Sequence, residues 1–226
     1  MRQRIVFVSF LFALTTAYSD PFGNLGFDEV NGSQIIFTPP NPAPFDGYGP
    51  VEDLLPGWQI TAGTNQYTLM GYQLKLDTTP TPPPFTSTYI LGPELSLPSF
   101  PIEGGYALAV GGQLEPTSLL QRGDIPSDAR WLCYSFAGYP FDVSINGRQL
   151  PYPGFRYPAA SRTEVRFDIS AYAGQNVELE LTMVDAAPFF DYRRHDYLDS
   201  IEFILPLVVE SDFNGDGASD IVFEHP

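Results

Sequence analysis

Residues 129–183 constrain the fold of this chain more than any other stretch, because they divide into short segments with the two-residue period of β-strands. Residues 129–136 are apolar at most positions, as in a central strand that is covered on both faces. In residues 141–145 apolar and polar side chains alternate, which predicts a strand with one buried and one exposed face. The dipeptide Asn146-Gly147 follows, and it favours the positive φ angles of a two-residue hairpin turn.

Two more alternating segments, residues 163–169 and 177–184, flank a compact connection, and we expect them to form an adjacent antiparallel pair. Strand patterns at 22–30 and 198–204 are expected to open and close the domain, whereas residues 114–128 show no clear period. The 20 glycines and 23 prolines of the chain argue against long helices. The sequence therefore predicts an all-β protein, an antiparallel β-sandwich of at least eight strands.

The first nineteen residues have the pattern of a secretory signal peptide. Arg2 and Arg4 precede an apolar run at residues 5–14, and small residues suitable for cleavage follow at 17–19, so we expect cleavage near Ser19. The apolar run is shorter than the roughly 20 residues that a membrane helix needs, and no other segment reaches that length, so no membrane span is predicted. We expect a secreted, periplasmic or cell-surface bacterial protein with a sandwich domain at 20–205 and a tail at 206–226.

The net charge of −16 excludes two classes of partner. Loss of Arg2 and Arg4 with the signal peptide would make the mature chain more acidic still, and nucleic acid and anionic membranes repel such a surface. Cys133 is the sole cysteine and lies in an apolar strand, so we expect a buried, unreactive thiol and no disulfide within the chain. Trp131, on the same strand, is also expected to be largely buried.

Several short motifs resemble the galactose-binding-like jelly-roll domains of secreted bacterial proteins. They are N-L-G-F-D-E at 24–29, L-P-G-W at 55–58, V-S-I-N-G-R at 143–148, F-D-I-S-A-Y-A-G-Q-N-V-E-L at 167–179 and Y-L-D-S-I-E-F at 197–203. The resemblance implies a jelly-roll sandwich over the region from Asp20 to Leu205. That family includes carbohydrate-binding modules, so the resemblance implies a polysaccharide or cell-surface glycan as partner. The resemblance also implies a structural calcium ion between the first and last strands.

The tail at 211–223 resembles the start of an FG-GAP or VCBS-type repeat with its calcium loop. Calcium prefers six to eight oxygen ligands, and alternating Asp and Asn side chains on a tight loop supply them. The side-chain ligands would be Asp212, Asn214, Asp216 and Asp220, with the backbone carbonyl of Ala218. The alternative is an acidic tail left from a decayed repeat.

A second calcium site is suggested by the closing strand. Asp199 is two and four residues from Ile201 and Phe203, so in a regular strand it would share their face and point inward. A buried carboxylate needs a partner. Asp28 or Glu29 at the start of the domain could share a cation with it, as the resemblance also implies. The alternative is a strand-end aspartate whose carboxylate accepts hydrogen bonds from backbone amides.

Two aromatic loops, residues 152–161 and 188–197, are the expected ligand site, because the predicted pairing of 163–169 with 177–184 brings them to one rim of the sandwich. Aromatic faces stack on pyranose rings, and Arg and His donate hydrogen bonds to hydroxyl groups. The candidate residues are Phe155, Arg156, Tyr157, Phe190, Tyr192, Arg193 and His195. The alternative is that these rings bury one another and the arginines pair with neighbouring aspartates.

No catalytic motif is recognisable. The two histidines have no zinc-type spacing, and no G-x-S-x-G sequence is present. We expect a non-catalytic, secreted glycan-binding module whose stability is assisted by calcium. A purely structural or adhesion-type surface protein is the alternative, and a glycoside-active enzyme with paired carboxylates is the third hypothesis.

Overall fold

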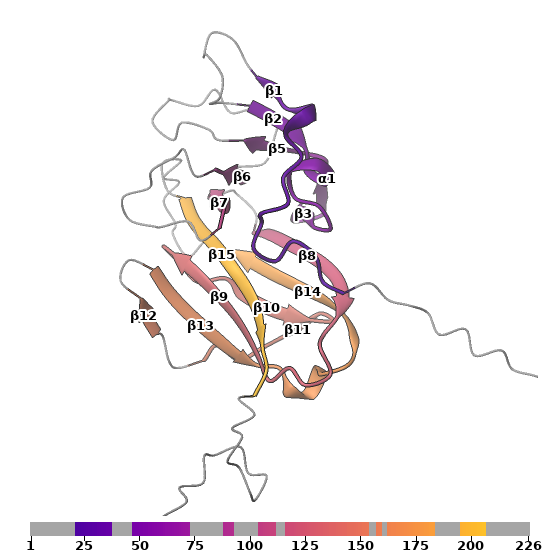
Figure 1. Cartoon of the computed structure of the whole chain (residues 1–226), viewed down its shortest axis with the longest axis vertical. Helices are drawn as coiled ribbons and strands as arrows, with labels where there is room; N and C mark the ends of the chain where they lie inside the picture. Colours follow the sequence, from indigo (N-terminus) through magenta and orange to yellow (C-terminus); the bar gives the residue numbers. More distant parts are fainter. Residues whose placement is uncertain are drawn as a thin grey trace, which may run out of the picture.

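The computed structural model describes residues 21–37, 47–72, 88–92, 104–111, 116–153, 157–159, 162–183 and 195–206 (Figure 1). In these residues two β-sheets pack face to face as a sandwich, which confirms the predicted all-β fold and the expectation of at least eight strands. None of the helices in these ranges is long and apolar enough to cross a membrane.

The larger sheet has nine strands, and every pair of neighbours in it is antiparallel except β5 and β6. In spatial order the strands are β1 (Ile36–Phe37), β2 (Gly47–Pro50), β5 (Leu69–Tyr72), β6 (Thr88–Leu91), β7 (Ala107–Gly111), β15 (His195–Ile204), β9 (Trp131–Ala137), β13 (Arg162–Asp168) and β12 (Tyr157–Ala159). The apolar strand β9 lies between β15 and β13, the central position that its composition predicts.

The smaller sheet has six antiparallel strands. They are, in spatial order, β11 (Arg148–Gln149), β10 (Asp142–Ile145), β14 (Asn176–Met183), β8 (Thr117–Asp124), β3 (Gln59–Ala62) and β4 (Asn65–Tyr67). Three single-turn helices complete the described elements: η1 (Gly32–Gln34), α1 (Val51–Leu54) and η2 (Ser170–Tyr172). The hairpin predicted at Asn146-Gly147 joins β10 to β11, and both of its residues have positive φ.

One continuous core fills the space between the sheets. Leu132, Tyr134 and Phe136 of β9 point into it from the larger sheet, and alternate residues of β14, such as Leu179 and Leu181, point into it from the smaller one. The second set of β9 side chains, which includes Cys133, therefore lies on the outer face of the larger sheet. Cys133 is only 3% exposed there, so the prediction of a buried thiol is confirmed.

The predicted pairing of residues 163–169 with 177–184 is wrong. The corresponding strands β13 and β14 belong to different sheets, and η2 carries the chain from one sheet to the other. Both strands bury every second side chain in the shared core, so an alternating pattern fits a crossover as well as a hairpin. The pattern identifies the buried face of each strand and leaves its neighbours undetermined.

Two more boundaries differ from the prediction. Residues 22–30 do not form a regular strand, because Asn24 and Phe27 have φ angles of 48° and 60°, which break an extended conformation. Residues 117–124, within the segment that shows no clear period, form the eight-residue strand β8. Its inward-facing positions include Thr117, Gln121 and Gly123, so its buried face is not a run of apolar residues.

Candidate functional site

Residues 21–30, which we call the strap, bridge the two sheets (Figure 1). On the smaller sheet, Nε2 of Gln121 donates a hydrogen bond to the carbonyl of Gly23 at 2.9 Å. On the larger sheet, the amide of Ile201 donates to the carbonyl of Leu25 at 3.2 Å. The strap is therefore hydrogen-bonded to both layers of the sandwich, and its position relative to β15 is determined by the fold.

The middle of the strap is buried and turns sharply. The ring of Phe27 is fully buried and lies 6.1 Å from that of Trp58, whose Nε1 donates to the carbonyl of Asn24 at 3.2 Å. Asn24 Oδ1 accepts a hydrogen bond from the Glu29 amide at 2.8 Å. A positive φ is costly for residues other than glycine, and these contacts hold Asn24 and Phe27 in that conformation.

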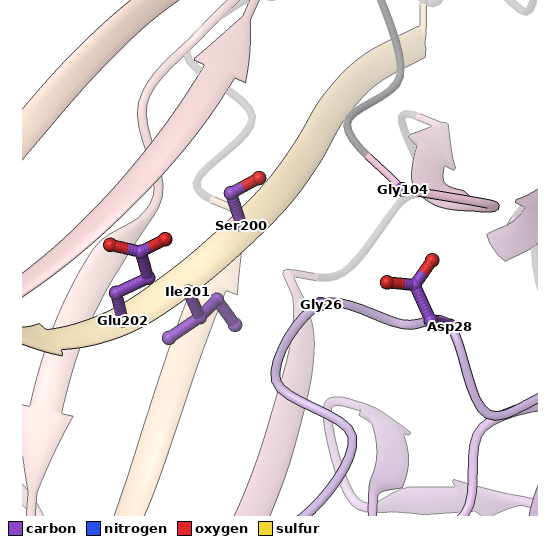
Figure 2. Close-up of a pocket in the computed structure, with 6 residues that line it drawn as sticks. All are labelled: Gly26, Asp28, Gly104, Ser200, Ile201 and Glu202. Atoms are coloured by element: carbon purple, nitrogen blue, oxygen red, sulfur yellow. The ribbon is translucent and has the colours of Figure 1, made fainter.

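A hollow of about 340 Å³ lies between the strap and β15, and Figure 2 shows its lining. The lining residues are Gly26, Asp28, Gly104, Ser200, Ile201 and Glu202. Asp28 comes from the strap, and Ser200 and Glu202 come from β15 on the opposite side. The hollow thus presents carboxylate and hydroxyl groups, both of which accept hydrogen bonds.

Asp28 holds the turn before β7. Its Oδ1 accepts hydrogen bonds from the amides of Gly105 at 2.5 Å and Tyr106 at 3.2 Å. Gly104 has a φ of +73°, and a Cβ built on it would lie 2.4 Å from Asp28 Oδ2. Only glycine adopts this positive φ without strain and leaves room for the Asp28 carboxylate, so the turn and the carboxylate are fitted to each other.

The β15 side of the hollow is formed by a bulge. The pairing of β15 with β9 changes register between Asp199 and Glu202, and Ser200 has a φ of 52°. Bulges redirect side chains and are frequent next to binding sites. The four described non-glycine residues with positive φ are Asn24, Phe27, Ser200 and Asn146, and all but the hairpin residue Asn146 lie in the strap or the bulge. Local strain is therefore concentrated around this hollow.

The predicted inward direction of Asp199 is wrong. Asp199 is paired with Ser135, whose neighbours on β9, Tyr134 and Phe136, point into the core, so Asp199 lies on the outer face of the larger sheet. The bulge at Ser200 interrupts the two-residue period, which removes the common parity with Ile201 and Phe203. Asp199 is nevertheless fully buried, and its Oδ1 accepts a hydrogen bond from the Ser200 amide at 2.7 Å, as the backbone-amide alternative expects.

The predicted cation shared by the strap and the last strand stays a prediction. Among them no three histidine, cysteine, aspartate or glutamate side chains come close enough to hold a metal ion. The carboxylate of Asp28 is directed to the turn amides, Glu29 is exposed, and Asp199 lies on the outer face. The strap and β15 do meet as expected, but at Ser200 and Glu202.

The predicted ligand residues are only partly within the described ranges. Tyr157 lies in the edge strand β12, opposite Glu164, and His195 begins β15, opposite Gly111. Strands β13 and β9 separate β12 from β15, so the backbones of these two residues are not adjacent. Phe155, Arg156, Phe190, Tyr192 and Arg193 lie outside the described residues, as do the tail ligands Asp212, Asn214, Asp216, Ala218 and Asp220. The loop site and the tail calcium loop stay predictions.

Gly104, Ser200 and Glu202 are site residues that the sequence analysis did not identify. The motif Y-L-D-S-I-E-F contains two of them, but its regular alternation gives no sign of a bulge. A glycine pair at Gly104-Gly105 after an irregular segment is the only local signal for the turn that receives Asp28.

Comparisons with known proteins give little further information. No model of a protein family matches the chain, and no characterised protein matches its sequence significantly. Among solved structures, it is similar to the K2 cleaved adhesin domain of Lys-gingipain (Kgp), with a TM-score of 0.36 and 14% sequence identity over 66% of this chain and 90% of that one. A similarity of this size supports no inference about function.

Proposed function

We propose that the chain is a secreted, non-catalytic binding module whose ligand is a glycan. The supporting observation is the hollow between the strap and β15, which combines hydrogen-bonding side chains with a strained and firmly held backbone. Its volume of about 340 Å³ is at the lower end of the range of small-molecule sites, roughly 300–1,000 Å³, and fits a single sugar ring.

The chemistry of the hollow suits hydroxyl groups. A carboxylate accepts hydrogen bonds from two neighbouring hydroxyls of a sugar, and the Ser200 hydroxyl can both donate and accept. Asp28 is held in place by two backbone amides, so its free oxygen is preorganised for a ligand. Glu202 is exposed, and its carboxylate can therefore turn toward a ligand without breaking a core contact.

Retention on immobilised polysaccharides tests the proposal. The mature protein would be passed over β-glucan, xylan, galactomannan, galactan and pectin, and the variant Glu202→Gln compared on any matrix that retains it. A hydrogen bond to a charged group contributes about 1.5–3 kcal/mol and one to a neutral group about 1 kcal/mol, so the variant, whose amide oxygen still accepts, should bind severalfold more weakly. Glu178→Gln, on the outer face of the smaller sheet, is the matched control and should bind normally.

Two results would contradict the proposal. Failure of the wild-type protein to bind any of the five polysaccharides would remove the glycan assignment. Release of reducing sugar from a bound polysaccharide would show that the carboxylates act on glycosidic bonds, and the module would then be an enzyme. The melting temperatures of both variants should match that of the wild type, because both glutamates lie outside the core.

A further inference from the structure

The outer face of the larger sheet carries a partly exposed tryptophan. Trp131 is the first residue of β9 and is opposite Asp168 on β13 and Ile204 on β15. Its neighbour Leu132 points into the core, so Trp131 points to the other face. Trp131 is less completely buried than Cys133, because it is half-buried while Cys133, two residues along the same face, is 3% exposed.

Charged side chains surround the Trp131 ring. The guanidinium of Arg130 lies 5.2 Å from the ring centroid, within the range of a cation–π contact. In the next row of the sheet Arg166 and Glu202 are both opposite Cys133, and Arg166 Nε is 2.7 Å from Glu164 Oε1. This corner of the sheet therefore combines one aromatic ring with both donors and acceptors of hydrogen bonds.

The corner is open to solvent. Arg130, Asp168 and Glu202 are exposed, and Arg166 and Ile204 are half-buried. Further along the same face, towards β7 and β6, Asp199, Ala109 and Leu91 are fully buried. A ligand can therefore reach the outer face at Trp131, and not at these buried positions.

The corner also adjoins the hollow. Glu202 lines the hollow and, as the partner of Cys133, stands diagonally across from Trp131 on neighbouring strands. Diagonal neighbours in a sheet are within about 8 Å of each other, which long side chains span. A ligand that occupies the hollow would pass Glu202 and reach the Trp131 ring.

We propose that Trp131, with Arg130, Arg166 and Glu202, is a second sugar subsite, so that the module binds a glycan of at least two rings and not a single terminal sugar. The inference rests on the proposed function and extends it. The apolar face of a pyranose ring would lie on Trp131, and its hydroxyls would bond to the flanking guanidinium and carboxylate groups. The mixed charges favour a neutral glycan, because an acidic ligand would meet Glu164, Glu202 and Asp168 and a basic one would meet the two arginines.

Intrinsic fluorescence can report on this subsite directly, because the chain has two tryptophans and Trp58 is 3% exposed. The emission spectrum of Trp131→Phe, subtracted from that of the wild type, isolates the signal of Trp131. Hexasaccharides of β-1,4-glucan, xylan, mannan and galactan serve as probes, each with its monosaccharide for comparison. We expect a saturable change in the Trp131 signal with at least one hexasaccharide and a much weaker response to its monosaccharide.

Affinities of variants complete the test. Trp131→Ala should reduce affinity for the responding hexasaccharide at least tenfold, and Trp131→Phe should lose less, because a smaller ring still stacks. Tyr139→Ala, which removes another exposed aromatic ring, is the matched control and should bind normally. Unchanged melting temperatures would show that the loss is not caused by unfolding.

The outcomes separate the two proposals. If a hexasaccharide binds the wild type but neither changes the Trp131 signal nor depends on Trp131, the second subsite is refuted while the glycan module stands. Equal affinity for the hexasaccharide and its monosaccharide would refute it as well. If no probe and no polysaccharide binds, the proposed function itself fails, and the subsite with it.

Discussion

Substitution of Tyr134 by Phe tests how the core holds the loop before β10. The Tyr134 hydroxyl is fully buried, donates a hydrogen bond to the Phe141 carbonyl at 2.6 Å and accepts one from the Phe141 amide at 2.9 Å. Removing it leaves a buried backbone donor and a buried acceptor without this partner, and each such group costs about 1–3 kcal/mol. The ring contacts with Phe136, Phe141 and Phe167 remain, so we expect only the cost of these two groups, a total loss of about 2–6 kcal/mol in the free energy of unfolding.

Equilibrium unfolding in urea measures this loss. Tyr172→Phe is the control, because Tyr172 is half-buried and its hydroxyl makes no hydrogen bond within the described residues; its effect should stay within about 0.5 kcal/mol. The denaturant dependence of the free energy should be equal in all three proteins. A loss below about 0.5 kcal/mol in Tyr134→Phe would refute the argument, since water or a shifted loop would then replace the hydroxyl.

Two further predictions concern the Cys133 thiol and the glycines Gly57 and Gly147. Burial raises the pKa of the Cys133 thiol from 9.0 to about 12. As the pH rises, the thiol of the unfolded chain therefore loses its proton before that of the folded chain, so the free energy of unfolding should fall between about pH 9 and pH 12. The fall should be less steep in Cys133→Ala, and equal slopes of the two proteins in urea titrations would contradict this. Gly57→Ala should lower the melting temperature more than Gly147→Ala. Both glycines have positive φ, but of the two only Gly57 has a side chain near the position of an added Cβ, which would lie 2.4 Å from Gln121 Nε2. Equal shifts in thermal unfolding would show that this contact relaxes at no cost.

Much of the fold could be predicted because the period of apolar side chains along a strand indicates which of its faces is buried. The alternation in residues 163–169 and 177–184 identifies the buried face of two strands, and Asn146-Gly147 identifies a turn that needs two positive φ angles. The apolar composition of residues 129–136 places β9 in the middle of a sheet. Each of these features depends on local backbone geometry and on contact with water, which the order of residues specifies directly.

The candidate site was less predictable, because it depends on departures from regular geometry. Asp199 lies on the opposite face from the expected one because a bulge follows it, where one residue, Ser200, takes a positive φ and reverses the faces that follow. Trp131 was expected to be largely buried because its strand is apolar on both faces, and the structure adds that the outer face is covered more completely at Cys133 than at the half-buried Trp131. Neither difference has a signature in the local sequence.

The sequence by itself determined the all-β class, the strands at 129–136 and 141–145 with the turn that follows, the buried faces of the strands at 163–169 and 177–184, and that the surface is acidic. Only the tertiary structure decided which strands pair, that residues 21–30 bridge two sheets instead of forming the expected opening strand, and that Asp28 faces Ser200 and Glu202 across a hollow. The physical reason is that burial of an apolar face is satisfied by any partner of suitable shape. The choice among partners comes from the packing of the whole chain, through contacts between residues as distant in sequence as Leu25 and Ile201.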